Sequence, residues 1–113
     1  MFGSVTFDAM TSALDALSLR QSAIADNIAN VQTPGYQAKR VQFEDALNAA
    51  VAQGSGLVQA TTKLSLEPTL ENGNNVNLDT EVVSNTDTTL RYQLATRAVD
   101  GEFSLLRAAM RTS

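Results

Sequence analysis

The chain has 113 residues, a net charge of −4 and 43% hydrophobic residues, with 16 alanines among them. This length fits a single domain or a small assembly subunit. Histidine and cysteine are absent from the sequence, which removes the commonest acid–base group at neutral pH, thiolate nucleophiles, disulfides and sulfur metal ligands. Because there is no basic block and no run of about 18 apolar residues, we expect neither a nucleic-acid partner nor a membrane-spanning segment.

A heptad pattern predicts an N-terminal helix over residues 6–31. Thr6 is the expected N-cap, and Asn30 is expected to stop the helix because asparagine tolerates the left-handed conformation. Only Gln21 interrupts the apolar positions, which are Met10, Leu14, Leu17, Ile24, Ile28 and Val31. A second stripe, made of small residues, would let a neighbouring helix approach closely, and it comprises Ala9, Ala13, Ala16 and Ala23.

A second long helix with two apolar faces is predicted over residues 79–111. Asp79 is the expected N-cap, and Asp87 and Arg91 have the spacing of a favourable i,i+4 ion pair. Gly101 costs about 1 kcal/mol relative to alanine in a helix, so it is either a tolerated glycine or the mark of a close helix crossing. One apolar face comprises Leu90, Leu94, Ala98, Leu105 and Ala108. The other comprises Tyr92, Ala95, Val99, Phe103, Leu106 and Met110.

The middle segment, residues 32–78, is expected to be irregular or weakly β, with one short helix. The spacing of Phe43, Leu47 and Val51 predicts this third helix, which would end at Gly54 or Gly56. Residues 57–70 show a faint strand alternation that Pro68 interrupts, and residues 72–75 read as a turn. Residues 39–40, a lysine and an arginine, are expected to begin a solvated loop.

Few residues could support chemistry. Ser18, Ser22 and Ser104 lie on predicted helices without a neighbouring base, which favours ordinary solvated hydroxyls over nucleophiles. The acidic residues around the asparagine-rich turn lack the spacing of a calcium loop. We therefore expect no catalytic residue, cofactor, metal site or small-molecule substrate.

The predicted fold class is mainly α, with two long terminal helices that pack as a coiled-coil hairpin or as one element of a tube. These helices carry more apolar surface than a two-helix hairpin can bury, and such surface marks contact with partners. We therefore favour a helical assembly subunit over a self-contained domain. The expected assembly interface comprises Met10, Leu14, Leu17, Ile24, Ile28, Val31, Leu90, Leu94, Val99, Phe103, Leu106 and Met110.

Directly after the first helix, residues 27–36 read N-I-A-N-V-Q-T-P-G-Y. Pro34 and Gly35 fit the two central positions of a type II turn, and Tyr36 could pack its ring with its hydroxyl toward water. The string resembles the N-terminal signature of the flagellar rod and hook axial proteins, N-x-A-N-x-x-T-P-G-Y. Its matching residues, here called the signature turn, are Asn27, Asn30, Thr33, Pro34, Gly35 and Tyr36.

Three further stretches resemble the short, proximal-rod members of this family: residues 17–21 (L-S-L-R-Q), 72–81 (N-G-N-N-V-N-L-D-T-E) and 90–93 (L-R-Y-Q). The chain departs from such relatives in its shorter middle segment. The resemblance implies a structural protein of the flagellar basal body, with terminal helices that form a tube around the axis of the drive shaft. It also implies type III export without a cleaved signal peptide, and a place in the rod within the periplasm.

The partners implied by the resemblance are other flagellar rod proteins, the rod-base adaptor, the MS-ring protein and the export apparatus. Two other functions remain open from the sequence. A small helical adaptor or chaperone of an export apparatus would bind partner helices transiently. A peptidoglycan-cleaving hydrolase would need paired acidic residues in a cleft, for which this chain has little room.

Overall fold

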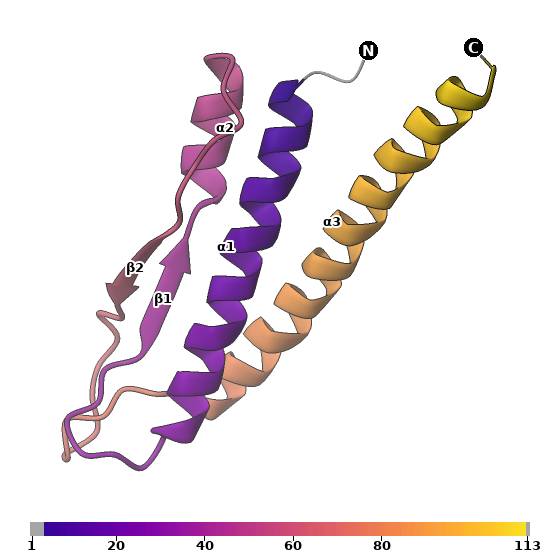
Figure 1. Cartoon of the computed structure of the whole chain (residues 1–113). Coiled ribbons are helices and arrows are strands. Elements are labelled where there is room, and N and C mark those ends of the chain that lie inside the picture. Colours follow the sequence, from indigo (N-terminus) through magenta and orange to yellow (C-terminus); the bar gives the residue numbers. More distant parts are fainter. Residues whose placement is uncertain (1–3, 113) are drawn as a thin grey trace.

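The computed structural model describes residues 4–112, and the side chains of residues 5–111. Two long helices, α1 (Ser4–Ala29) and α3 (Leu78–Thr112), flank a middle segment made of β1 (Lys39–Gln42), α2 (Glu44–Ala52) and β2 (Thr61–Leu64). In Figure 1, α1 lies between α3 on one side and the layer of β1, β2 and α2 on the other. The molecule is elongated, measuring 66 × 26 × 14 Å. The predicted fold class is confirmed: mainly helical, with two long terminal helices and a small β element between them.

The first helix begins at Ser4, so Thr6 lies inside its first turn rather than at the expected N-cap. The helix ends at Ala29, where the N–H of Asn30 bonds to the carbonyl of Asp26 at 3.1 Å. The expected left-handed conformation of Asn30 is wrong, because no non-glycine residue described by the structure has a positive φ. Instead, the Asn30 amide donates to Asp26 O (2.8 Å), and the Thr33 hydroxyl donates to Asn30 Oδ1 (3.0 Å). These bonds satisfy the helix end without a strained backbone.

The second long helix begins at Leu78, one residue earlier than predicted, and its N-cap is Asn77 rather than Asp79. Asn77 Oδ1 accepts hydrogen bonds from the backbone N–H groups of Asp79 (3.1 Å) and Thr80 (3.3 Å). Asparagine is among the best N-cap residues because its side-chain oxygen reaches these unpaired donors. The predicted ion pair between Asp87 and Arg91 is confirmed, with Nε and Oδ2 2.9 Å apart.

The middle segment contains a strand that the sequence did not predict. β1 pairs antiparallel with β2, so that Lys39 lies opposite Leu64 and Gln42 opposite Thr61. The expectation of a solvated loop at residues 39–40 was therefore wrong. The weak strand expected within residues 57–70 is confirmed as β2.

The short third helix is confirmed as α2, which ends at Ala52, ahead of Gly54 with its positive φ of 89°. The loop that follows is held against α1 by Ser12. The Ser12 hydroxyl donates to Gly56 O (2.7 Å) and accepts from the N–H of Val58 (3.2 Å). A Cβ at Gly56 would collide with the backbone of α1, whereas a Cβ at Gly101 would meet nothing within 4 Å. Among the described residues, the close approach therefore occurs at Gly56, and none of them crosses α3 closely at Gly101.

The core is small. Ala16 and Leu17 of α1 form a buried cluster with Phe43, which immediately precedes α2. The Arg20 guanidinium lies 5.0 Å from the centre of the Phe43 ring, a cation–π distance. The partly buried residues around the cluster are Ala13, Leu47, Ala60 and Ala95. With so few large apolar side chains buried, polar contacts must position much of the fold.

Candidate functional site: a polar junction and two uncovered helix faces

Within the signature turn, residues 33–36 form the type II turn that the sequence predicts. The N–H of Tyr36 donates to Thr33 O at 3.3 Å, and Gly35, the third residue of the turn, has φ of 75°. A type II turn needs a positive φ at this position, which glycine adopts without steric cost. Gly35 also donates to Asn72 O (2.8 Å), so the turn is joined to the asparagine-rich stretch.

Asn27 is the centre of the polar junction between α1, β1 and α3. Its side chain is fully buried, and its amide donates to Lys39 O (3.0 Å) while its oxygen accepts from the N–H of Lys39 (2.8 Å). The side chain thus pairs with β1 much as a neighbouring strand would. The Tyr36 hydroxyl also donates to Asn27 Oδ1 (3.2 Å), so the expectation that it faces water was wrong.

Glu81 of α3 is a buried carboxylate at the same junction, with an exposed fraction of 0%. Its Oε1 lies 2.6 Å from Nη1 of Arg40 and accepts from the amide of Asn27 at 3.1 Å. A buried carboxylate is costly unless it is paired and hydrogen-bonded, and here both kinds of partner are present. Glu81 therefore ties the start of α3 to β1 and α1.

The stretch of residues 72–81 binds the signature turn through two buried asparagines. The Asn74 amide donates to Asn30 O and Thr33 O, both at 2.8 Å, and so binds one carbonyl just past the end of α1 and one carbonyl of the turn. Asn75 Oδ1 accepts from the N–H of Ala38 (2.6 Å), and the backbone N–H of Asn75 donates to Tyr36 O (3.2 Å). The sequence predicted a turn in this stretch but not its role as a bridge.

Arg20 joins α1 to the middle segment. It donates to both carboxylate oxygens of Glu44, at 2.8 and 2.7 Å, and to Val41 O at 2.7 Å. The hydrogen bonds from Arg20 hold the pKa of Glu44 below its ordinary value of 4.5, although partial burial opposes this shift. Arg91 of α3 lies 3.8 Å from the same carboxylate. Each stretch that carried the family resemblance therefore supplies a residue to the polar contacts that join α1, the middle segment and α3.

The structure divides the predicted assembly interface into buried and accessible residues. Leu17 and Ile24 are buried within the chain, whereas Met10, Leu14, Val31 and Val99 are half-buried. The exposed members are Ile28, Leu90, Leu94, Phe103, Leu106 and Met110. The rings of Phe7 and Phe103 make an edge-to-face contact at 5.8 Å, which links the two long helices near the chain termini.

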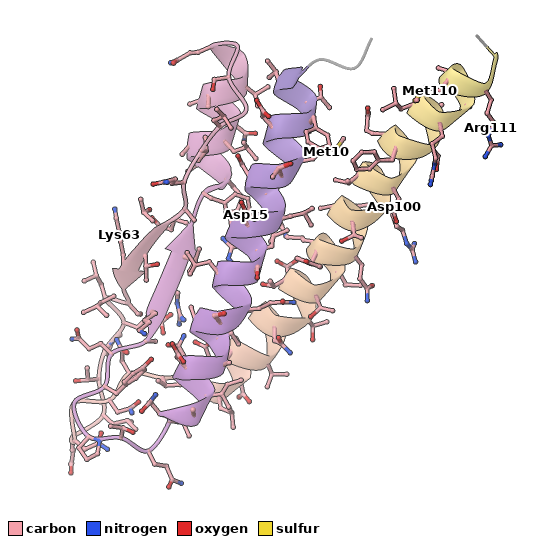
Figure 2. All side chains as sticks on the ribbon, in the orientation of Figure 1. Met10, Asp15, Lys63, Asp100, Met110 and Arg111 are labelled. Carbon is pink, nitrogen blue, oxygen red and sulfur yellow. The ribbon has the colours of Figure 1, made fainter. Side chains whose placement is uncertain are left out.

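Two helix faces are covered by no other part of the chain that the structure describes. One, here called the far side of α3, consists of Leu90, Leu94, Ala98, Gly101 and Leu105, all exposed. The other, here called the open face of α1, consists of Thr11, Asp15, Ser18, Ser22, Ala25 and Ala29, also exposed. Leu94 is 71% exposed and Leu90 61%. Figure 2 shows Arg111 at the end of α3, turned away from α1.

The described residues offer little for other chemistry. No group of three or more His, Cys, Asp or Glu among them could hold a metal ion. Ser104 is exposed and lies 3.5 Å from an Arg107 nitrogen, while Ser18 and Ser22 are exposed on α1. No described helix combines the length and the hydropathy that crossing a bilayer requires.

Comparison with known proteins assigns the class. The family model for the flagella basal body rod protein matches residues 7–37, which span most of α1 and the signature turn. These proteins are structural components of the flagellar basal body rod.

The curated relatives narrow the assignment. The chain is 37% identical to the flagellar basal body rod protein FlgB of Borrelia hermsii over 106 residues, which cover 74% of this chain and 78% of the relative. It is 32% identical to FlgB of Escherichia coli K12, over 80% of this chain and 81% of the relative. Its identity to FlgB of Bacillus subtilis 168 is 26%, over 95% of this chain and 94% of the relative. The chain belongs to the FlgB family of flagellar basal body rod proteins.

These alignments also bear on the length of the chain. The alignment with the Borrelia hermsii protein spans 106 positions, whereas 74% of 113 residues is about 84 residues. The relative therefore carries about 22 residues within the matched region that this chain lacks. The sequence predicts a middle segment shorter than that of such relatives.

Proposed function

We propose that this chain is a subunit of the proximal rod, where it assembles with other axial proteins into the drive shaft that passes through the cell envelope. Its terminal helices would pack side by side with those of its neighbours around the axis, and the middle segment would lie outside them. The chain would act as a passive, load-bearing element and not as an enzyme.

The observation that carries this proposal is the far side of α3. Leu90, Leu94 and Leu105 are exposed by 60% or more and lie in one stripe along a helix of 35 residues. Contiguous apolar surface of this kind marks a contact with another protein. In a rod, such stripes would become buried between neighbouring subunits, and torque would be shared among many helix contacts.

The polar junction supports the same function in a different way. A load-bearing subunit needs its two long helices at a fixed relative orientation. Asn27, Arg40 and Glu81 fix that orientation through directional hydrogen bonds and one short ion pair. Buried polar contacts of this type favour one arrangement because alternatives leave a charge unpaired.

The neighbours we propose are other rod proteins, the rod-base adaptor and the MS-ring protein. We further propose that the chain reaches the periplasm through the flagellar export apparatus, without a cleaved signal peptide. These assignments follow from the family resemblance, and the lack of cysteine is compatible with export as an unfolded chain.

Cryo-electron microscopy of purified basal bodies tests the function. An affinity-tagged chain is expressed in the flagellated organism that encodes it, and the map is searched for α1 and α3 beside the rod axis. We expect several copies of the chain in the rod. A chain that co-purifies only with soluble export proteins, in defined one-to-one complexes, would instead identify it as an adaptor.

A further inference from the structure

The two uncovered helix faces differ in chemistry. The far side of α3 is apolar, whereas the open face of α1 consists of small and polar residues. A contact between two unlike faces is heterologous, so it can repeat around an axis instead of closing on itself as a two-fold dimer. Small side chains on one helix also let an apolar helix approach closely.

The charges near these faces match when two copies stand side by side at the same height. The first half of α1 carries Asp8 and Asp15 and no basic residue. At the same end of the molecule, where α1 begins and α3 ends in Figure 1, residues 94–111 of α3 carry three arginines against two carboxylates. Arg97 borders the far side, because it lies one helical turn from Leu94 and from Gly101, and Figure 2 shows Arg111 pointing away from α1 near the end of α3.

Two carboxylates beside these faces at the opposite end of the molecule are already paired within the chain. Asp26 lies 3.2 Å from Lys39, and Asp87 lies 2.9 Å from Arg91. Asp15 lies on the open face near the start of α1 and Arg97 lies beside the far side of α3, and neither side chain forms an ion pair within the described part of the chain. Complementary charges across a contact set its register and its choice of partner more than its affinity.

We propose that the far side of α3 docks on the open face of α1 of a second copy of this chain, with the two copies at the same axial height. Asp15 of one copy then lies near Arg97 of its neighbour. Each copy uses both faces at once, so the contact continues from copy to copy around the axis. This inference rests on the proposed rod function, which it extends by naming the lateral partner and the register.

Cysteine cross-linking in assembled basal bodies tests the contact, because the chain has no cysteine of its own. One copy carries Thr11→Cys on the open face and a size tag, and a second, untagged copy carries Ala98→Cys on the far side. Both positions lie about one helical turn below the contact of Phe7 with Phe103. The two copies are co-expressed, basal bodies are purified, and a short bis-maleimide is added.

We expect a cross-linked product that contains one tagged and one untagged copy. Ala29→Cys is the matched control, because it lies on the same open face about 27 Å lower along the helix. Paired with Ala98→Cys, it should give at least about tenfold less product, since the two thiols seldom meet. A product formed mainly between two Ala98→Cys copies would replace the proposed contact with a two-fold one.

Charge exchange gives a second readout. Asp15→Arg or Arg97→Asp alone should lower the yield of the Thr11–Ala98 product about fivefold, as for a partly exposed ion pair. Both changes in every copy should restore it. Asp45→Arg on α2 and Lys63→Asp on β2 are controls of equal charge change that lie outside both faces. Equal yields from all variants would contradict the register.

The outcomes separate this inference from the rod function. If the chain is absent from basal bodies, the proposed function fails. If the chain is present but Thr11→Cys and Ala98→Cys give no joint product, the lateral contact is wrong and the rod function stands.

Discussion

Asn27 and Asn75 satisfy backbone groups that a larger sheet would pair with another strand. Asn27 bonds to both the N–H and the carbonyl of Lys39, and Asn75 accepts from the N–H of Ala38 while donating to Ser65 O at 3.1 Å. A side-chain amide suits this role because it carries a donor and an acceptor side by side. Two asparagines therefore allow a two-stranded sheet to pack closely on α1.

Asn27→Asp should strongly destabilise the chain. The change removes the amide that donates to Lys39 O and to Glu81, and places a second carboxylate beside the buried Glu81. We expect the free energy of unfolding to fall by about 3–5 kcal/mol, the range for a buried charge left without its partner. Urea unfolding measures this, with the exposed Asn48→Asp on α2 as the control. A loss below about 1 kcal/mol, as at an ordinary surface site, would contradict the role of Asn27.

The pair of Arg20 and Glu44 should make stability depend on pH. Its hydrogen bonds lower the pKa of Glu44 below 4.5, so the ion pair stabilises the fold above that pH, and its contribution is lost as pH falls through the lower value in the folded state. Because the Glu44 side chain is 40% exposed, the effect should be small.

Glu44→Gln should therefore lower the unfolding midpoint at about pH 6 and make little difference at about pH 3. Glu71→Gln, at an exposed position, serves as the control. A difference between wild type and Glu44→Gln that stays constant across this pH range would show that ionisation of Glu44 does not stabilise the fold.

Single residues differ in how far the sequence reveals their roles. The type II turn at Pro34 and Gly35 was predictable because both determinants are adjacent in sequence. The contact of Asn27 with Glu81 was not, because 54 residues separate them and nothing local to either residue encodes the pairing. An acidic residue in the first turn of a helix is ordinarily explained by the helix dipole, which concealed the buried role of Glu81.

Among the elements, α1 and α3 were predictable and β1 was not. A helix of 26 or 35 residues repeats its apolar pattern many times, so the period is recognisable even where single positions deviate. β1 has four residues, two of them basic, and offers no alternation to detect. On the edge of β1 that faces away from β2, Asn27 and Arg20 of α1 bind the backbone N–H of Lys39 and the carbonyl of Val41. These contacts join residues far apart in sequence, so no local pattern reveals them.

Two glycines should respond in opposite directions to substitution by alanine. Gly101→Ala should raise the free energy of unfolding by about 0.5–1 kcal/mol, because the position is helical and a Cβ would meet nothing within 4 Å. Gly56→Ala should lower it, because the added Cβ would collide with the backbone of α1 at Val5 and Ala9. Thermal unfolding of the two variants beside wild type measures both, and stabilisation by Gly56→Ala would contradict the packing of this loop on α1.

For the molecule as a whole, alanine-rich and aromatic-poor composition corresponds to a core too small to cover the long helices. The buried apolar cluster contains Ala16, Leu17 and Phe43, whereas the far side of α3 remains open. Polar contacts hold the start of α3 in place, and its second half has no fully buried residue among those described. Internal polar contacts thus fix the orientation of the two long helices, and the far side of α3 offers an apolar surface to neighbouring subunits.

The central claim, that α3 buries its far side against other subunits in the rod, is tested most directly by the incorporation of Leu94→Asp into basal bodies. Leu94 is 71% exposed, so the isolated variant should unfold within about 1 kcal/mol of wild type. Leu66→Asp is the matched control, since Leu66 is 99% exposed on the middle segment. We predict that the number of copies in purified basal bodies falls to background for Leu94→Asp, because a charge would enter an apolar contact, and stays at the wild-type level for Leu66→Asp. Wild-type incorporation of Leu94→Asp would contradict the account.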